Sequence, residues 1–430
     1  MAKRKAEGFV ARGFERVLEE FQRNLDERGE LGAAFAATRD GEPVVDLWGG
    51  LARDAPAKHW SRDSLQVIFS GTKGLVALCL LMQIDRGLID PDAPVSDYWP
   101  QFAAARKERI RVCEVASHRA RLPGIRALLT LDDVLDSERM ASWLAEQPQE
   151  SDPRAAATYH PLTFGWLCAE LIRRVDGRSV GAFFAEEVAG PLGLDLWIGL
   201  PDRLEARVTT LRCAEGWCAE LLDEKRVARD ELLRRVWANP PCLRAADRLP
   251  WNTRAFHAAQ IPGAGAIGTA RSIARLYGCL AQGGQIGGIR LVSESVLQRA
   301  RVCLTSRRDP LTGDLDAFGL GFALQTSSHP FGPAADGFGH TGAGGSVHGA
   351  WPAARVGFSY CMNHLRDDVA VDPRPQALLH ALHASLSDRP FGRPPAVSPD
   401  ETDRGTRSRW AHAHDRCTAG REPVAPRDVR

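Results

Sequence analysis

Ser70 and Lys73 have the types and the spacing of a nucleophile and its activator. They lie where an extended apolar run, residues 65–69, gives way to an apolar helical run, residues 75–84. Residues three apart on a helix share a face, so the lysine amine can reach the serine hydroxyl. The start of a helix also stabilises negative charge on oxygen. The pair therefore suits a lysine-activated serine nucleophile, although a helix-capping serine followed by an exposed lysine gives the same pattern.

Two further stretches could complete such a centre. Tyr159 follows a polar loop and precedes a helical pattern, and its hydroxyl could relay the serine proton. Residues 339–346 read Gly-His-Thr-Gly-Ala-Gly-Gly-Ser, and small residues in and after a strand let a substrate lie against the chain. A main-chain N–H there could form an oxyanion hole with the N–H of Ser70. A packing tyrosine and a flexible glycine turn are the alternatives.

Two other motifs match catalytic or binding patterns but lack the required context. Residues 263–268 read G-x-G-x-x-G, yet Gln-Ile-Pro precedes them instead of a buried strand, and no acidic residue follows about twenty positions later. Residues 177–181 read G-x-S-x-G, but a helix precedes them where a nucleophile elbow needs a strand. Ser179 is therefore expected to cap a helix rather than to react.

Hydrophobic periodicity predicts strands near both ends of the chain and helices between them. The order predicts an α+β fold, with one domain from residues 8–94 and 253–387, a mainly helical domain over 95–252 and a disordered tail over 388–430. The predicted helices cover residues 13–28, 75–84, 110–117, 131–146, 159–175, 180–188, 266–283, 294–300 and 376–386, and the predicted strands cover 33–38, 43–48, 318–325, 345–351 and 355–362.

Composition excludes several classes of function. The 430-residue chain has a formal net charge of +1, so no global field favours nucleic acid or an anionic membrane. No stretch approaches the about 20 apolar residues of a membrane span, and the basic N-terminus has no apolar segment of a secretory signal. Ten scattered cysteines indicate buried thiols in a reducing, cytoplasmic compartment, with no structural metal. Oligomeric state stays open.

Ser70-x-x-Lys73, Tyr159 and His340-Thr341-Gly342 follow one another in an order that resembles the serine β-lactamase and penicillin-binding-protein superfamily. Within it the chain is most similar to class C β-lactamase-like serine hydrolases, especially family VIII carboxylesterases. The resemblance spans residues 14–386. It implies a β-lactamase/DD-peptidase-like fold with an antiparallel sheet flanked by helices. The stretches that carry it are residues 41–50, 69–74, 90–95, 159–166, 190–194, 268–274 and 339–342.

The resemblance also implies roles for individual residues. Ser70 would be the acylated nucleophile, and Lys73 would accept its proton or activate it electrostatically. Tyr159 would act as general base and acid. The N–H groups of Ser70 and Ala343 would form the oxyanion hole. The implied substrate-binding residues are His340, Thr341 and Gly342, and no cofactor is implied.

Two departures from the family pattern point away from β-lactams. Pro161 stands where class C β-lactamases have an asparagine that binds the antibiotic, and proline offers no side-chain hydrogen bond. His340 replaces a lysine that helps to hold the antibiotic's carboxylate, and histidine is mostly neutral near pH 7. Both changes favour a neutral ester as the substrate.

Three further departures keep a weakened or non-catalytic protein open. Arg121 and Arg154 stand where the family has glycine, and an arginine at Arg121 would strain a turn if φ were positive there. Residues 347–352, which include His348, also differ from the family pattern.

We therefore predict a cytoplasmic serine hydrolase that cleaves short-chain, small-molecule carboxylic esters through an acyl-Ser70 intermediate. The same centre could instead serve a β-lactamase, a D-amino-acid peptidase or an acyltransferase. A non-catalytic binding protein with a vestigial site is the alternative from another class.

Overall fold

The helices and strands were defined in a computed structural model, which describes residues 5–387 except residues 55, 245–247 and 368–371. The predicted tail, 388–430, lies outside the described residues. The strands are β1 (Ala6–Val10), β2 (Gly32–Arg39), β3 (Glu42–Asp54), β4 (Ala57–His59), β5 (Gln66–Val67), β6 (Leu196–Ile198), β7 (Arg212–Cys213), β8 (Ala266–Gly268), β9 (Gln285–Ile286), β10 (Ile289–Arg290), β11 (Thr305–Arg308), β12 (Leu315–Phe318), β13 (Ala323–Leu324), β14 (Phe338–Thr341), β15 (Val347–Trp351), β16 (Val356–Met362) and β17 (His364–Leu365). The helices are α1 (Glu15–Glu27), α2 (Thr72–Asp85), α3 (Val95–Tyr98), α4 (Val112–Ala116), α5 (Leu131–Leu135), α6 (Ser137–Glu146), α7 (Thr163–Asp176), α8 (Val180–Phe184), α9 (Gly190–Leu192), α10 (Glu224–Arg229), α11 (Glu231–Trp237), α12 (Arg254–Ala258), α13 (Ala270–Ala281), α14 (Glu294–Ala300) and α15 (Pro373–Ser387).

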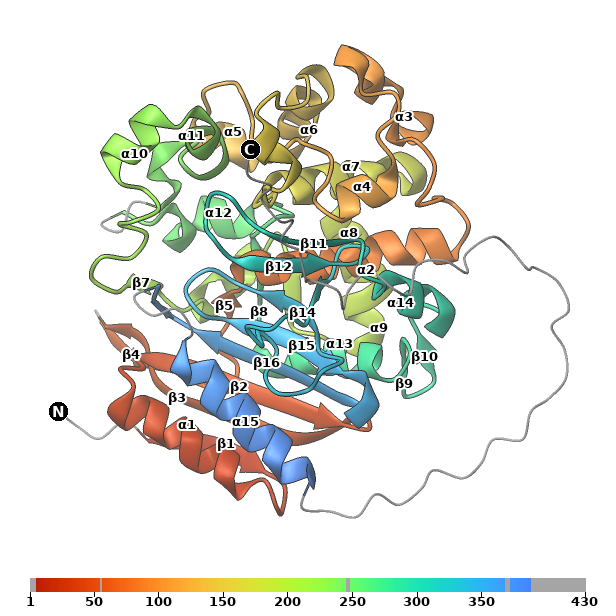
Figure 1. Cartoon of the computed structure of the whole chain (residues 1–430). Coiled ribbons are helices and arrows are strands. Elements are labelled where there is room, and N and C mark those ends of the chain that lie inside the picture. The colour runs from red at the N-terminus through yellow and green to blue at the C-terminus, as the bar shows by residue number, and fades with distance from the viewer. Residues whose placement is uncertain (1–4, 55, 245–247, 368–371, 388–430) are drawn as a thin grey trace, which may run out of the picture. The chain divides into compact units, whose positions relative to one another are not determined.

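One large antiparallel sheet joins segments from both ends of the described chain (Figure 1). Its strand order is β1-β3-β2-β16-β15-β14-β13-β12-β11, and β4 adds to β3. The central contact pairs β2 with β16, which are more than 300 residues apart in sequence at the Arg39–Val356 pair. The α+β fold class predicted from the order of the elements is thereby confirmed.

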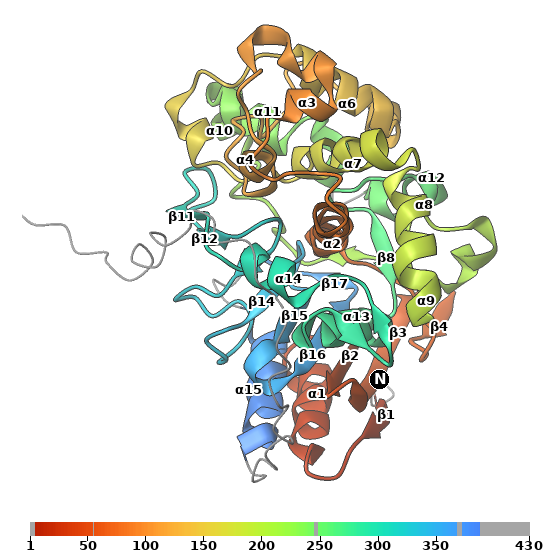
Figure 2. The same cartoon turned by 90° about the vertical axis from the view of Figure 1, so that its right-hand side faces the viewer.

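Helices cover both faces of this sheet. Helices α1 and α15 pack against each other on one face, and α13 packs on β2, β15 and β16 from the other (Figures 1 and 2). Every residue of β16 is buried as a result. Gly357 permits the close contact with α13, because a Cβ at that position would overlap the backbone nitrogen of Gly278.

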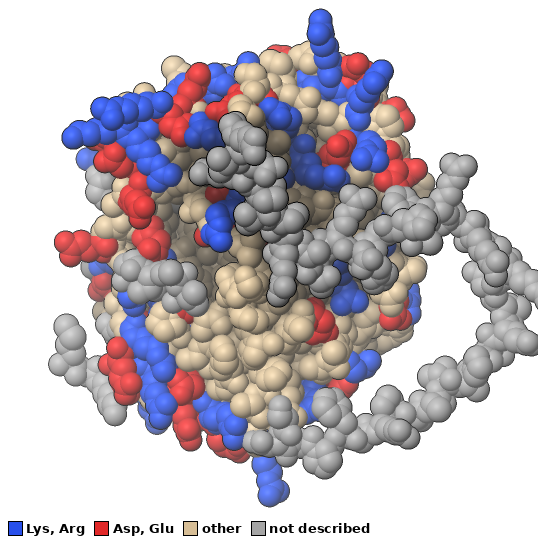
Figure 3. All heavy atoms as spheres, viewed as in Figure 1, with Lys and Arg blue, Asp and Glu red and all other residues tan. Residues whose placement is uncertain are grey.

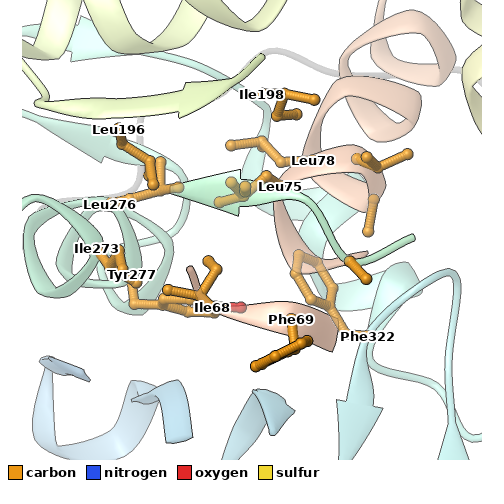
Figure 4. Close-up of a cluster of buried hydrophobic side chains, with 14 of the residues drawn as sticks. Ile68, Phe69, Leu75, Leu78, Leu196, Ile198, Ile273, Leu276, Tyr277 and Phe322 are labelled. Atoms are coloured by element: carbon orange, nitrogen blue, oxygen red, sulfur yellow. The ribbon is translucent and has the colours of Figure 1, made fainter. Parts of the chain in front are cut away.

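Helix α2 runs through the interior. Its residues from Thr72 to Ile84 are all buried, as expected for a helix that is apolar on every side. Leu75 and Leu78 of this helix lie in an apolar cluster with side chains from β6, α13 and the segment before Ser70 (Figure 4). The core therefore fixes the helix whose N-terminal end carries the candidate nucleophile.

The predicted hairpin at Asp40-Gly41 is confirmed. Both residues have positive φ, 52° and 85°, as a tight two-residue hairpin turn requires. Predicted helix 131–146 is instead two helices, because Asp136 is extended and its side chain accepts a hydrogen bond from the Arg139 N–H to cap α6. Predicted helix 266–283 begins as strand β8, and Thr269 then caps α13.

Helices α3 to α11 fall within residues 95–252, which the sequence assigned to a mainly helical domain. That division into domains stays a prediction. Among the described residues, no helix is both long and apolar enough to cross a lipid bilayer.

Leu78 offers a test of the α2 core. The side chain is 0% exposed, so Leu78→Ala should leave a cavity and lower the free energy of unfolding by about 2–5 kcal/mol. Leu128→Ala is the matched control, since Leu128 is 80% exposed and the change should cost less than about 0.5 kcal/mol. Urea denaturation of both variants measures the difference, and equal losses would contradict the placement of α2.

Candidate active site

Ser70 lies in a single turn of 3-10 helix, η1 (Phe69–Gly71), that leads directly into α2. The preceding residue, Phe69, has φ of 45°, a left-handed conformation that costs a non-glycine residue free energy. Its carbonyl accepts a hydrogen bond from the Thr72 hydroxyl at 2.6 Å, and its ring lies edge-on to Trp251. This strained turn points Ser70 away from the core, and Ser70 is the partly exposed residue between buried neighbours.

Lys73 is completely buried beside Ser70. Its Nζ donates hydrogen bonds to the carbonyls of Pro161 (2.6 Å) and Gly263 (2.7 Å), and lies 2.9 Å from Ser70 Oγ. Carbonyl oxygens can only accept. A neutral amine that gives its two N–H bonds to them would present its lone pair to the Ser70 hydroxyl, and an ammonium would present a third N–H. The neutral form can accept the Ser70 proton, and the charged form can stabilise negative charge on the Ser70 oxygen.

Tyr159 completes the cluster from the segment before α7. Its hydroxyl donates to Ser70 Oγ at 3.2 Å, and its ring stacks on Phe318 at 5.7 Å. The backbone N–H of Tyr159 donates to the buried carboxylate of Asp309 at 2.6 Å. The sequence predicted that a helix begins at Tyr159, but α7 begins at Thr163, because Pro161 disfavours a helical conformation of His160.

A pair of buried histidines supports the tyrosine segment. His118 packs against the Tyr159 ring at 4.6 Å, and its Nδ1 accepts a hydrogen bond from the His160 N–H. Burial, followed by the nearby cations, holds the pKa of His118 well below its usual range. Burial likewise lowers the pKa of His160 to about 3. Both rings are therefore neutral near pH 7 and act as packing and hydrogen-bonding groups.

The turn after β14 faces the Ser70 turn. Strand β14 packs on η1, and Gly342 lies against the Ile68 carbonyl so closely that a side chain would not fit. Within the described residues, the N–H groups of Ser70 and Ala343 have no hydrogen-bond acceptor. Two unused N–H donors beside a nucleophile are what an oxyanion hole requires.

Arg374 fastens this turn from behind. Its guanidinium is fully buried and donates to the carbonyl of Gly344 at 3.2 Å, while ion pairs with Glu30 and Asp372 balance its charge. The buried Arg374 thus ties the turn to α15, and Glu30 ties it to the segment between α1 and β2.

His340 lies on β14 directly opposite His348 of β15. Burial, followed by the charge of Lys73, lowers the pKa of His340 to about 3. Its Nδ1 lies 3.0 Å from the Thr341 carbonyl, so Nδ1 carries the proton and donates it there. The lowered pKa agrees with the neutral histidine expected from the sequence. His348 packs under the nucleophile turn, where a Cβ on Gly71 would lie 2.5 Å from the His348 ring.

Ser70, Tyr159, His340, Thr341, Gly342 and Ala343 all line one pocket of about 940 Å³. Its other walls are largely aromatic and aliphatic, and they include residues of the segment between β7 and α12 that the sequence could not place. The larger aromatic and aliphatic wall residues are Phe69, Leu162, Trp217, Leu221, Val236, Trp237, Leu243, Trp251, Leu311 and Phe318.

On the face shown in Figure 3, basic and acidic side chains are interspersed rather than gathered into a patch of one sign.

Every site residue predicted from the sequence lies in or against this pocket, and Lys73 reaches it through Ser70. Ser179 lies elsewhere, and its hydroxyl accepts the Ala182 N–H to cap α8, as expected. The described residues contain no group of three or more potential metal ligands.

Sequence reasoning missed the two carbonyls that hold Lys73. The rejected glycine motif at residues 263–268 contained the one usable signal. A Cβ on Gly165 would overlap the Gly263 backbone, and a Cβ on Gly263 would overlap the Leu162 backbone. No signal marked Asp309 or His118.

A strained arginine lies at the edge of the site. Arg121 has φ of 55°, the positive value for which the sequence analysis expected strain. Its guanidinium donates to the carbonyls of Glu150 and Asp152 at 2.7–3.0 Å, and the Glu150 N–H returns a bond to the Arg121 carbonyl. The side chain thus offsets strain that its own backbone creates.

The sheet and the Ser–Lys–Tyr cluster beside it define a protein of the β-lactamase/DD-peptidase-like fold. The family model described as beta-lactamase matches residues 14–382. The chain belongs to the beta-lactamase family.

Individual relatives agree with this assignment. The chain is 35% identical over 355 residues to the esterase/beta-lactamase LipL of Mycobacterium tuberculosis. The matched region covers 78% of this chain and 77% of LipL. It is similar to the crystal structure of a family VIII carboxylesterase, with a TM-score of 0.79, 35% identity, and coverage of 89% of this chain and 100% of the other. A penicillin-binding protein homologue from Caulobacter crescentus gives a TM-score of 0.76 at 33% identity, with coverage of 89% and 100%.

Two variants at Arg121 separate backbone strain from side-chain bonding. Arg121→Ala removes the guanidinium but keeps a Cβ in the left-handed conformation, so we expect a loss of about 1–3 kcal/mol in the free energy of unfolding. Arg121→Gly removes the same bonds but relieves the strain, and it should be more stable than the alanine variant by about 1 kcal/mol. Urea denaturation compares them, and a glycine variant less stable than the alanine variant would contradict the strain.

The buried histidines predict loss of stability in acid. Burial lowers the pKa of His160, His340 and His348 to about 3, against a usual value of 6.5. Between these values the unfolded chain binds protons that the folded chain does not, so stability is full above pH 6.5 and falls as the pH drops. Each histidine should cost about 1.4 kcal/mol per pH unit.

Asp316 offsets one of these three protons below about pH 7, because burial raises its pKa from 3.8 to about 7 and the folded chain then binds a proton that the unfolded chain does not. Urea denaturation at pH 7.5, 6.5 and 5.5 measures the net slope. Equal stability at the three pH values would show that the histidines are not buried as described.

Proposed function

We propose that the protein is a serine hydrolase that cleaves short-chain carboxylic esters through an acyl-Ser70 intermediate. The observation that carries the proposal is the contact of Ser70 Oγ with both Lys73 Nζ, at 2.9 Å, and the Tyr159 hydroxyl, at 3.2 Å, at the base of an open pocket. A nucleophile needs a group that takes its proton and a second group that supplies one to the leaving oxygen.

In the acylation step, Ser70 Oγ attacks the ester carbonyl carbon and its proton passes to the Lys73 amine or to the Tyr159 oxygen. The N–H groups of Ser70 and Ala343 receive the carbonyl oxygen as its negative charge develops. Tyr159 then gives a proton to the alkoxide as the carbon–oxygen bond breaks. The alcohol leaves, and the acyl group stays on Ser70.

In the deacylation step, water attacks the same carbonyl carbon. Tyr159, now deprotonated, takes a proton from that water, and the oxyanion again lies between the two N–H groups. Collapse of the intermediate breaks the bond to Ser70 Oγ, which recovers its proton from Tyr159 or Lys73. The carboxylic acid leaves, and the centre is restored.

The surroundings of this centre favour esters over β-lactams. His340 is neutral and adds no positive charge to hold a carboxylate. Pro161 contributes its carbonyl to Lys73 and has no side-chain amide to offer a substrate. LipL and the family VIII carboxylesterase carry esterase names, and their likeness to this chain supports the same chemistry here.

The expected setting follows from the composition and the thiols. The eight cysteines whose side chains the structure describes are all free, which supports the reducing, cytoplasmic compartment expected from the sequence. The expected partner is a small neutral ester.

Hydrolysis of p-nitrophenyl butyrate tests the proposal. The wild-type protein should release p-nitrophenol, and Ser70→Ala should lower kcat/KM by at least about 10³-fold because the acyl-enzyme cannot form. Intact mass spectrometry should show the butyryl adduct on the wild type alone.

Ser179→Ala is the matched control, since it removes a serine hydroxyl outside the Ser70 pocket that caps α8 and accepts a hydrogen bond from Gln260; it should keep the wild-type rate. Equal rates for the wild type and Ser70→Ala would reject the proposal. A chromogenic cephalosporin and a D-alanyl peptide, offered in parallel, distinguish the β-lactamase and peptidase alternatives, and ester formation with an added alcohol reveals an acyltransferase.

A further inference from the structure

Asp316 places a carboxylate in the wall of the active-site pocket. It lies on β12, two residues before Phe318, so both side chains lie on the same face of the strand. Both residues line the pocket, and the Phe318 ring stacks on Tyr159. The surface that begins at the proposed proton donor thus continues along β12 to Asp316.

The Asp316 carboxylate has no hydrogen bond or ion pair with any described residue. The residue opposite it across the strand pair is Arg307, which could have neutralised it. The Arg307 guanidinium instead donates to the carbonyls of Ala156 and His118, at 2.7 and 2.6 Å. The charge of Arg307 favours the ionised carboxylate without touching it. A half-buried carboxylate with no hydrogen bond is still unfavourable, and a ligand that supplies positive charge would remove that cost.

The other charges of the pocket do not fill this role. Arg226, at the pocket margin, is exposed, and its guanidinium donates to the Leu311 carbonyl at 2.6 Å. The remaining charged residues in the lining apart from Asp316 are acidic: Glu220, Asp314 and Asp367. His340, the histidine in the lining, is neutral. The pocket therefore attracts a cation more strongly than an anion.

Aromatic rings surround the same space. Trp217, Trp237 and Trp251 line the pocket together with Phe318 and Tyr159, and the face of an aromatic ring attracts an ammonium group. A neutral ester needs neither an unpaired carboxylate nor so many rings. Both features suit a substrate that carries a positive charge beside its apolar part.

We propose that Asp316 is a specificity-determining residue that binds an ammonium group on the alcohol portion of the ester substrate. The proposal rests on the esterase function proposed above and names its substrate class. The alcohol side is assigned because Tyr159 protonates the leaving alkoxide, and the Tyr159–Phe318–Asp316 surface leads away from that oxygen. Specificity here means a higher kcat/KM for an ester with an ammonium group than for an uncharged ester of the same shape.

A pair of isosteric esters tests the proposal. The probes are the butyrate ester of 2-(trimethylammonio)ethanol and 3,3-dimethylbutyl butyrate, which differ by a nitrogen and its charge. Wild-type kcat/KM should favour the cationic ester by about tenfold or more, the size of one charge contact at a partly buried site. Asp316→Asn keeps the shape but removes the charge, and the preference should fall to near unity. Asp316→Glu should restore part of it.

Asp314→Asn is the matched control, because it removes an equal charge from an exposed aspartate two residues away. It should keep most of the preference. If Asp314→Asn lowered the preference for the cationic ester as much as Asp316→Asn does, the preference would come from the general negative charge of the pocket and not from a contact with Asp316. That result would overturn the proposal. Thermal unfolding of each variant confirms that it is folded.

The wild type alone supplies a second measurement. Burial, then the charges of Asp314 and Asp309, raises the pKa of Asp316 to about 7. Only the ionised form attracts a cation, so the preference should rise from pH 6 to pH 8. Both esters react at one centre and neither probe titrates, so titration of that centre cancels in the ratio. The charged or titratable groups around Asp316 are Arg226, Arg307, Asp309, Asp314, Glu220, Asp367, His340, Tyr159 and Lys73.

The outcomes separate this proposal from the one on which it rests. No hydrolysis of 3,3-dimethylbutyl butyrate or p-nitrophenyl butyrate by the wild type would reject the esterase function itself. Hydrolysis of both with a cationic-to-neutral ratio near unity, or with a ratio unchanged from pH 6 to pH 8, would reject the role of Asp316 and leave the esterase function standing.

Discussion

The buried Lys73 amine is the constraint on which the rest of the site depends. A lysine without access to water must find oxygen acceptors within the protein, and two come from the carbonyls of Pro161 and Gly263. These residues lie 88 and 190 positions from Lys73. Three distant segments must therefore meet at one nitrogen. Gly165 of α7 can approach the Gly263 backbone only because Gly165 has no side chain, and the lack of one on Gly263 permits its contact with the Leu162 backbone.

The same amine accounts for the electrostatics around it. Burial is the main cause of the low pKa values of His118, His160 and His340, and the charge of Lys73 lowers each of them further. The neighbours of Lys73 thus remain uncharged near pH 7. The Lys73 amine lies beside the nucleophile, and the acidic residues of the pocket lining are Glu220, Asp314, Asp316 and Asp367.

The sequence could specify the chemistry and the order of the elements, but not the contacts that hold them. Ser70 and Lys73 are three residues apart, so local helix geometry was enough to bring them together. Tyr159 is far along the chain, and its place beside Ser70 depended on the family resemblance. Asp309 bonds the backbone of Tyr159, and a backbone N–H has no sequence pattern that would reveal its acceptor.

Boundaries were misplaced where a side chain competes with the backbone for hydrogen bonds. Asp136 divides one predicted helix into α5 and α6 by capping the second. Residues 266–268 pair as strand β8 with β5 and β6, although they continue the apolar pattern of α13. In both cases a tertiary or capping contact outweighs local periodicity. The wall between β7 and α12 was unassigned for a similar reason, because its short helices have little periodicity of their own.

Two arginines that replace family glycines act on a single loop. Arg121 donates to the carbonyls of Glu150 and Asp152. Arg154 forms hydrogen bonds with the carboxylates of Asp152 and Asp230. Both guanidinium groups therefore converge on Asp152, seven residues before Tyr159.

A glycine at either position would leave that loop with fewer bonds. The loop ends at the residue that must hold its hydroxyl within 3.2 Å of Ser70 Oγ. The left-handed backbone conformation of Arg121 costs free energy of folding. The hydrogen bonds of its side chain stabilise the segment that carries Tyr159. Departures that read as damage in the sequence are thus, in the folded chain, supports for the proposed catalytic tyrosine.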